Sequence, residues 1–485
     1  MKKTVILLLI VLFVLPIQAQ SIKKSDLKVL YVGQNPETPN RYMFANSLGD
    51  KIWKEDIIPE RAKVFHEFFQ KYFNTVDLVY GEEYNEGLTK KYDVVVFDAV
   101  PRQLNGELTE SGWDLKYISD NYDKPTILIA GVAGPILSEK KSKIQVLCNC
   151  LDSHAYYFDE NHPVFSTPYK LPIKTDTEMR APNQSVHVYF SGRNLPEKMP
   201  MLKMQDVDLK KYPPGIVALP GFDDSPDAET IACGPSIKMV EAVSIGRHGN
   251  FFQWGYRADP RHLTESGKLA LINSIHYISN FKGQKPFVKR LKQPRSLALN
   301  FVYSATDKAY TYEIKNKLKS HDRLNSAKIK ELGGTLKEEN KYILNYETKL
   351  PDRAYYLQQV PKQLLQKFGD DWNAYLSYYE ANAGYMGLRK EITDEKTDGF
   401  LKIMFDKDLQ NLGIANNDIK LLDTCIFMLK SNDRPELAQR LLLRYTQETF
   451  TTVKLWQKWF KKNRDKLFFT ETGGYKWMIN TIRDK

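Results

Sequence analysis

Short apolar runs alternate with amphipathic stretches over the first 280 residues, and this alternation predicts the fold. Residues 27–33, 76–81, 92–101, 124–130 and 215–221 read as strands, and residues 60–72 read as a helix with an apolar face. The run YDVVVFDAVP has no polar alternation, which is typical of a parallel strand covered on both faces. We therefore expect an α/β fold: a largely parallel, flavodoxin-like sheet with helices on both faces.

Residues 240–280 form the most informative stretch of this region. Two strand-like runs flank GRHGN, in which the glycines favour a hairpin turn, and the second run, FFQWGY, is strongly aromatic. Thr264 then precedes an amphipathic segment and is a good N-cap. The stretch predicts a strand, a turn over residues 246–250, a second strand and a closing helix.

The composition changes after residue 280. Residues 281–300 are rich in lysine, arginine and proline, which predicts a basic linker. Beyond it, apolar residues spaced by three and four predict helices over residues 360–367, 372–379, 418–430 and 436–445. We expect residues 301–485 to form an all-α domain. The aromatic side chains near its end are expected to form a core seam, with a sugar-stacking platform as the alternative.

The first nineteen residues have the pattern of a secretory signal peptide. Lys2 and Lys3 precede an apolar run that is too short to cross a bilayer, and Ala19 offers a small-residue cleavage point. We therefore expect an exported protein, periplasmic or secreted, with no transmembrane anchor. Loss of the two lysines lowers the formal net charge from +11 to +9 (11 − 2). The mixed distribution of charge argues against a nucleic-acid partner.

Four cysteines remain after the leader: Cys148, Cys150, Cys233 and Cys425. Export permits a disulfide between Cys233 and either Cys148 or Cys150, and Cys425 lies in an apolar helical run that predicts a buried free thiol. The Cys-Asn-Cys pair is also a soft-metal motif, but no further Cys or His follows at a matching spacing, so no metal or other cofactor is predicted.

The strands and turns named above, above all IGRHGNFFQWGYRADPRHLTESGKLALINSIHYI, carry a resemblance to a known family. Residues 27–280 resemble the class I glutamine-amidotransferase-like fold, in its trehalose-utilisation (ThuA-like) branch. The resemblance implies a nucleophilic cysteine on the turn after residues 126–129, but Ala130 stands there. It also implies a histidine before the last helix, where the chain reads FQWG. Glutamine hydrolysis by the family's route is therefore not expected.

The candidate site residues follow from their positions on the predicted strands. Asp98, at the end of a buried strand, and His248, in the hairpin turn, are candidates for acid–base catalysis. Arg247, Asn250, Trp254 and His162 are the residues that we expect to bind a ligand.

Three functions remain open from the sequence. The first is binding or processing of a carbohydrate-type ligand in a cleft at the carboxyl edge of the sheet. The second is a catalytically silent scaffold of the cell envelope, whose helical domain binds another envelope protein. The third is a hydrolase that uses a metal held by His154, His162 and nearby acids.

Overall fold

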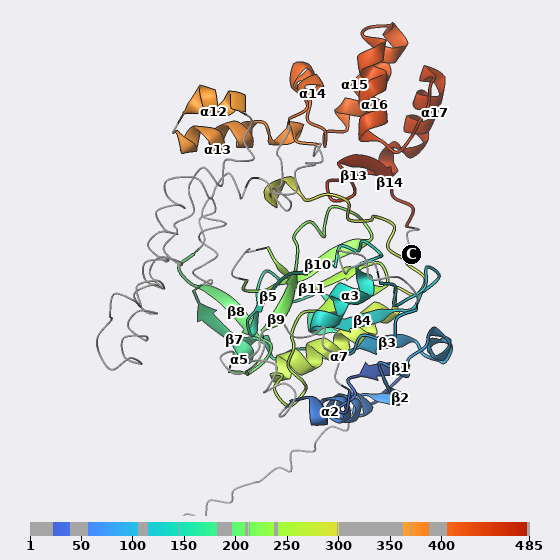
Figure 1. Cartoon of the computed structure of the whole chain (residues 1–485), viewed down its shortest axis with the longest axis vertical. Coiled ribbons are helices and arrows are strands. Elements are labelled where there is room, and N and C mark those ends of the chain that lie inside the picture. The colour runs from blue at the N-terminus through green and yellow to red at the C-terminus, as the bar shows by residue number, and fades with distance from the viewer. Residues whose placement is uncertain are drawn as a thin grey trace, which may run out of the picture.

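The structure is a computed structural model. It describes residues 23–38, 57–104, 115–144, 146–181, 196–208, 212, 214–236, 241–297, 299, 362–369, 371–387 and 405–482. The predicted signal peptide, residues 1–19, lies outside these residues. The N-terminal part is built on a large sheet, and the C-terminal helices lie together on one side of it (Figure 1).

The nine-stranded sheet has the order β2-β1-β3-β4-β12-β11-β9-β5, with β10 also paired to β11. The first five strands in this order run parallel, and the remaining pairs are antiparallel. The expected α/β class is therefore confirmed, with a mixed sheet. The strands are β1 (Ser25–Gly33), β2 (Phe73–Tyr80), β3 (Val94–Phe97), β4 (Thr126–Ile129), β5 (Val146–Leu151), β9 (Gly215–Ala218), β10 (Ala228–Cys233), β11 (Val243–His248) and β12 (Phe251–Trp254).

The central strands are apolar because they are covered on both sides. All four residues of β3 and of β4 are buried, as expected for runs without polar alternation. Helix α2 (Ile58–Gln70) packs on β1 and β2, with the Tyr31 ring 5.5 Å from that of Phe65. Helix α7 (Glu265–Ser279) packs on β3, β4 and β12, and Thr264 caps it by accepting a hydrogen bond from the Gly267 amide at 3.0 Å.

The hairpin between β11 and β12 is tighter than the sequence predicts. Gly246 and Arg247 belong to β11, and only Gly249 and Asn250 connect the strands. Gly249 has φ +59°, and a Cβ there would lie 2.5 Å from the Gln284 carbonyl oxygen. The turn therefore needs glycine at this position.

Smaller elements complete the N-terminal part. A three-stranded sheet of order β6-β8-β7 forms within the segment between β5 and β9. The elements are η3 (Glu86–Lys91), η4 (Ala130–Val132), α3 (Ala133–Leu137), β6 (His154–Ala155), α4 (Pro163–Ser166), α5 (Ile173–Asp176), β7 (Thr177–Arg180) and β8 (Met199–Lys203).

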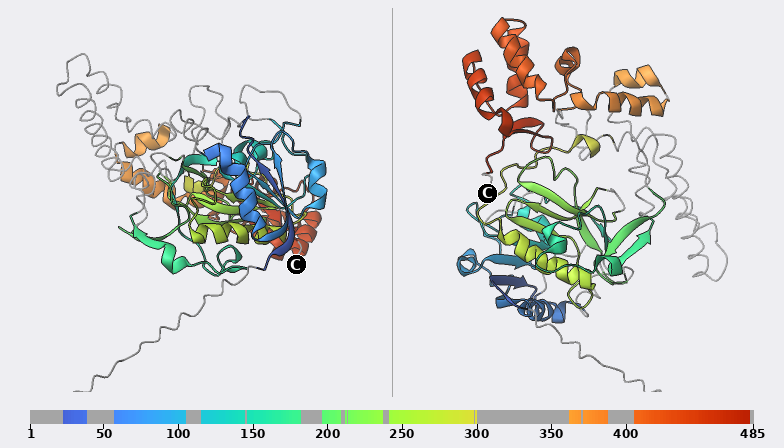
Figure 2. Two further views of the ribbon diagram at one scale, coloured as in Figure 1. Left: turned by 90° about the horizontal axis from the view of Figure 1, so that it is seen from below. Right: turned by 180° about the vertical axis from the view of Figure 1, so that it is seen from behind.

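The C-terminal part contains a hairpin as well as helices, so the all-α expectation needs correction. Strands β13 (Leu467–Thr470) and β14 (Lys476–Ile479) pair antiparallel and lie between the helices and the α/β part (Figures 1 and 2). The aromatic seam is a core, as predicted: Trp456 is fully buried and Trp477 nearly so. The helices are α12 (Lys362–Phe368), α13 (Trp372–Ala381), η6 (Ala383–Tyr385), α14 (Lys407–Leu412), α15 (Lys420–Ser431), α16 (Pro435–Tyr445), α17 (Val453–Asn463) and η8 (Arg464–Lys466).

The turn of this hairpin joins the two parts. Thr472 donates to the Asp224 carboxylate from its amide, at 2.7 Å, and from its hydroxyl, at 2.9 Å. Arg295, from the segment predicted to be a linker, contacts the Glu471 carboxylate and donates to the Asn416 side chain at 2.9 Å. Arg290, from the same segment, donates to the Pro220 carbonyl oxygen of the α/β part at 2.9 Å, so the basic segment is held against both parts.

Within the described residues, no helix has both the length and the apolar character needed to span a membrane.

Candidate functional site

The predicted site residues lie at two opposite edges of the sheet. The carboxyl edge is where β1, β3, β4 and β12 end, and Asp98 lies there because it follows β3. Strand β11 runs antiparallel to β12, so Arg247 and His248 lie at the amino edge, where His248 pairs with Phe251 at the start of β12. Three inter-strand spacings and about three residues along the strand separate Asp98 from His248, a distance of roughly 17 Å. The two predicted catalytic residues therefore do not share a site.

At the carboxyl edge, Asp98 forms a closed, buried ion pair. Arg61 donates to both of its carboxylate oxygens at 2.7 Å, and Tyr31 donates to one of them at 3.0 Å. The side chains of Asp98 and Arg61 have no exposed surface. Gln34, which follows β1, donates to the Asp98 carbonyl oxygen at 3.0 Å. We call Tyr31, Gln34, Arg61 and Asp98 the Asp98 cluster.

This cluster lies where parallel α/β sheets bind ligands. The chain passes from β1 to β2 on one side of β1 and then from β2 to β3 on its other side. The carboxyl ends of β1 and β3 are therefore the switch point of the sheet. Burial raises the pKa of the Asp98 carboxyl, and Arg61 and Tyr31 act against this shift. Burial also acts on Arg61, but Asp98 more than compensates, so the pKa of Arg61 lies above its ordinary value. The pair is mutually satisfied and sealed from solvent.

Ala130 occupies a strained turn at the same edge. It directly follows β4 and has φ +49°, in the left-handed region that disfavours residues other than glycine. Arg61 donates to the Arg257 carbonyl oxygen at 2.8 Å as well as to Asp98. Since β4 lies between β3 and β12, the guanidinium spans the end of β4. The chain thus turns sharply at Ala130 from β4 into η4 and α3, and the side chain at this turn is a methyl group.

At the amino edge, His248 is part of a buried network. Its Nδ1 accepts from the Lys143 amide at 3.0 Å, and its Nε2 lies 3.2 Å from an Asp227 carboxylate oxygen. A backbone amide can only donate, so the neutral ring carries its proton on Nε2 and donates to Asp227. The Lys143 ammonium contacts the Asp224 carboxylate and donates to Ser225 at 2.5 Å. We call these five residues the Asp227 network.

The charged groups of Lys143 and Asp227 in this network are buried. Burial lowers the pKa of His248, and the Asp227 carboxylate only partly offsets this effect. Burial would raise the pKa of Asp227, but hydrogen bonds from His248 and Ser225 outweigh it and hold the pKa well below its usual range. The His248 ring is fully buried and both ring nitrogens are engaged. The prediction that His248 acts as an acid or base conflicts with this burial.

Beside this network, the partly exposed carboxylate of Glu229 is contacted by three side chains from three other segments. Glu229, on β10, faces Arg247 across the strand pair, with Arg247 Nε 3.4 Å from Glu229 Oε2. His162 Nε2 lies 3.1 Å from Glu229 Oε1, and the Tyr277 hydroxyl of α7 donates to Oε2. The Arg247 guanidinium lies 4.0 Å above the Phe281 ring. We call these five residues the Glu229 cluster.

The Glu229 side chain keeps about a third of its surface exposed (32%). Burial acts to raise its pKa, but the hydrogen bonds from His162 and Tyr277 outweigh burial and lower the pKa to about 2. Burial and the Glu229 charge raise the pKa of Tyr277 well above its usual range. The cluster therefore brings an ionised carboxylate, the Arg247 and His162 side chains and two aromatic rings to one place. Two predicted ligand-binding residues, Arg247 and His162, are brought together here.

The other two predicted ligand-binding residues have internal positions. Asn250 is fully buried and donates to the Lys124 carbonyl oxygen at 2.7 Å, which fixes the hairpin turn to the segment before β4. Trp254 is fully buried in β12, with its ring 5.4 Å from that of Tyr256. Neither side chain is placed to meet a ligand from solvent.

The predicted metal ligands are engaged separately. His154 Nε2 contacts Glu178 at 2.6 Å, whereas His162 contacts Glu229. In the part of the chain that the structure describes, no group of three His, Cys, Asp or Glu side chains is arranged to hold a metal ion.

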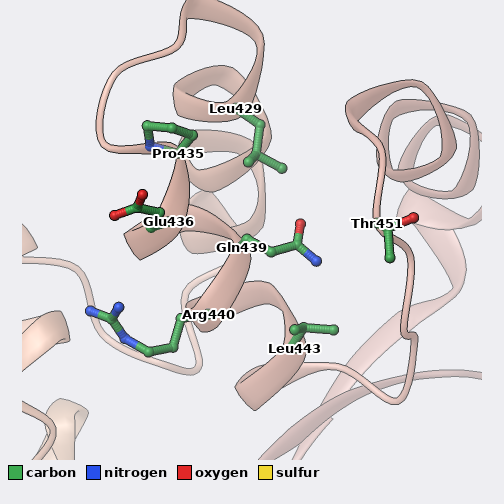
Figure 3. Close-up of a pocket in the computed structure, with 7 residues that line it drawn as sticks. All are labelled: Leu429, Pro435, Glu436, Gln439, Arg440, Leu443 and Thr451. Carbon is green, nitrogen blue, oxygen red and sulfur yellow. The ribbon is translucent and has the colours of Figure 1, made fainter.

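A groove lies on the C-terminal helices. It has a volume of about 540 Å³ and runs along one face of α16, between α15 and the segment before α17 (Figure 3). Leu443, in this groove, and the nearby helix residue Leu455 keep 41% and 44% of their surfaces exposed. The lining residues are Leu429, Pro435, Glu436, Gln439, Arg440, Leu443 and Thr451.

Sequence reasoning missed Arg61, Glu229 and Tyr277 as site residues. Arg61 lies within a predicted apolar helix face, where a lone arginine indicates a buried partner. Glu229 is the second residue of β10, and only the β10–β11 register places it opposite Arg247.

No protein-family model matches the chain, and a search of curated proteins found no significant match.

Proposed function

We propose that the chain is an exported, ThuA-like protein without amidotransferase activity that binds a carbohydrate-type ligand at the Glu229 cluster. The observation that carries this proposal is the convergence of His162, Arg247 and Tyr277 on the partly exposed carboxylate of Glu229. The site is at the amino edge, not in the carboxyl-edge cleft that the sequence suggests.

The chemistry of the cluster suits a sugar. Neighbouring hydroxyls of a sugar both donate and accept, and a carboxylate beside a guanidinium offers the complementary pair of partners. The half-buried rings of Tyr277 and Phe281 can cover the apolar C–H face of a pyranose. Arg247 is held over Phe281 and is therefore already oriented, which limits the entropy lost on binding.

Two observations support the family part of the proposal and the absence of amidotransferase activity. The strand order β2-β1-β3-β4-β12 is a parallel, flavodoxin-like arrangement, and β4 leads into the strained turn at Ala130. That turn bears no thiol, and Phe252, Gln253 and Trp254 supply no imidazole. The Asp98 cluster leaves no ionisable side chain free to replace them, because its carboxylate is paired and buried.

The test is a thermal-shift and calorimetry screen of residues 20–485 against mono- and disaccharides and sugar acids. A ligand at a hundred times its dissociation constant stabilises the folded state by about 2.7 kcal/mol. Glu229→Gln should abolish the shift because it removes the charge but keeps the shape. Glu178→Gln is the matched control, since Glu178 also pairs with a histidine but lies elsewhere. A failure of every compound, or binding unchanged in Glu229→Gln, would overturn the proposal.

The groove on α16 favours a second candidate, an interaction protein of the cell envelope. Its lining is mainly apolar, and Leu443 is exposed there, as expected for a groove that accepts an apolar partner segment. Leu443→Glu should abolish capture of an envelope protein by the full chain and leave sugar binding intact. Capture that is unaffected by this change would remove the groove from consideration.

A further inference from the structure

A disulfide joins two cysteines that are only two residues apart. Cys148 and Cys150 lie on β5, and residues two apart on a strand project from the same face. The bond closes a ring of three residues in a strand that already pairs with β9. This overturns the expectation that Cys233 pairs with one of them; Cys233 is a free, buried thiol.

The position of this bond suits exchange better than structural cross-linking. A disulfide stabilises a fold mainly by closing a long loop of the unfolded chain, and a three-residue ring gives the smallest gain of this kind. β5 is the last strand in the order of the sheet, and both cysteines are only partly buried. A disulfide that is only partly covered and links no distant segments is the kind that other thiols reduce readily.

Ser236 makes the two sulfurs unequal. Its hydroxyl lies 3.2 Å from the Cys150 sulfur. A disulfide sulfur carries no hydrogen, so the hydroxyl is the donor. The same hydroxyl can stabilise the negative charge that Cys150 acquires when the bond breaks, and a stabilised thiolate leaves faster. Cys150 is therefore the better leaving group, and Cys148 the sulfur that an incoming thiolate attacks.

We propose that Cys148–Cys150 is a redox-active disulfide that accepts two electrons from a protein dithiol, and that Ser236 positions the reaction by stabilising the Cys150 thiolate. The partner thiolate attacks the Cys148 sulfur, the bond to Cys150 breaks, and its electron pair leaves with Cys150. The second partner thiolate then attacks the partner's own sulfur in the mixed disulfide and releases the Cys148 thiolate. The partner becomes a disulfide, and this chain becomes a dithiol that takes up the two protons.

The other two cysteines are the internal controls. Burial raises the pKa of Cys233 and of Cys425 to about 12, so neither thiol forms a thiolate at neutral pH. A reaction at these thiols would require the fold to open.

The first experiment measures native-state reduction of residues 20–485, purified without reductant. A reduced peptide with a Cys-x-x-Cys pair and, separately, reduced glutathione are the probes. We expect the dithiol peptide to expose two thiols per molecule, mapped by mass spectrometry to Cys148 and Cys150, with unchanged circular dichroism. Glutathione should act at least tenfold more slowly because it cannot resolve the mixed disulfide within one molecule. Thiols that are already free at the start, or a bond that yields only after unfolding, would overturn the proposal.

Variants test the assigned roles. Cys150→Ser should accumulate a stable mixed disulfide at Cys148 with a Cys-x-x-Ser peptide supplied as its symmetric disulfide, because neither partner then has a second thiol that can resolve it. Ser236→Ala should slow reduction about fivefold, since a hydrogen bond to a charged group is lost, with no change in melting temperature. A purely structural bond predicts the reverse: Cys148→Ser would lower the melting temperature, and Ser236→Ala would leave the rate of reduction unchanged.

Discussion

Removal of the Asp98 carboxylate is the sharpest test of the carboxyl edge. Asp98→Ala leaves the Arg61 guanidinium in a site with no exposed surface and without its two 2.7 Å hydrogen bonds. Removing one partner of a buried pair costs about 3–5 kcal/mol, because the remaining charge cannot be solvated. For a chain of several hundred residues we expect the melting temperature to fall by about 4 °C.

The assay is urea denaturation followed by circular dichroism, with a double mutant to isolate the pair. Arg61→Met and Asp98→Leu together remove both charges, so their combined loss should be well below the sum of the single losses. The double mutant should still be less stable than the unchanged protein, because Arg61 also donates to the Arg257 carbonyl oxygen and Arg61→Met removes this hydrogen bond. Asp206→Ala, which breaks an exposed pair with Lys203, is the control and should not change the midpoint.

Two results would refute this reasoning. A loss of under about 1 kcal/mol in Asp98→Ala would mean that water reaches the guanidinium. Additive losses in the double mutant would mean that the two side chains do not interact.

The remaining predictions concern acid stability, backbone strain and the C-terminal core. Because the pKa of Glu229 falls from 4.5 to about 2 on folding, the contribution of Glu229 to the free energy of unfolding is complete above pH 4.5 and is lost as the pH falls through 2. As the pH is lowered over this range, the urea midpoint should therefore fall less steeply for Glu229→Gln than for the unchanged protein. Parallel plots of midpoint against pH for the two proteins would contradict the ion pairs. Ala130→Gly should stabilise the protein by roughly 1 kcal/mol in urea denaturation, because glycine adopts φ +49° without strain, and a loss of stability would contradict the turn. Trp456→Ala should cost about 4 kcal/mol in the same assay, whereas Leu455→Ala, at its exposed neighbour, should cost little; equal losses would contradict the core.

The strands and long helices could be predicted because their signals are local. The unbroken apolar runs in β3 and β4 gave buried parallel strands, and the Thr264 cap marked the start of α7. The β13–β14 hairpin was missed because its aromatic residues fit a helical seam equally well. The GlyGly pair between its strands, at residues 473–474, is the turn signal that could have revealed it.

The candidate site could not be assembled from the sequence because strand direction decides it. Asp98 and His248 both end strands, and a parallel sheet would have brought them to one edge. Strand β11 is antiparallel to its neighbours, which moves Arg247 and His248 to the other edge. The predicted hairpin turn records that β11 reverses direction against β12, but only the long-range parallel pairing of β12 with β4 puts that turn at the amino edge.

The contact between Thr472 and Asp224 has a consequence for how the chain acquires its structure. These residues are 248 positions apart, and Asp224 belongs to the same network that surrounds His248. The amides of Phe287 and Val288 also donate to the Asp227 carboxylate, at 2.8 and 3.0 Å. During synthesis the Asp224 carboxylate therefore gains the two Thr472 donors only after residue 472 has been made. A fragment that stops at residue 280 would lack the Thr472 donors to the partly buried Asp224 and the Phe287 and Val288 donors to the buried Asp227, so we expect it to be less stable than the full chain.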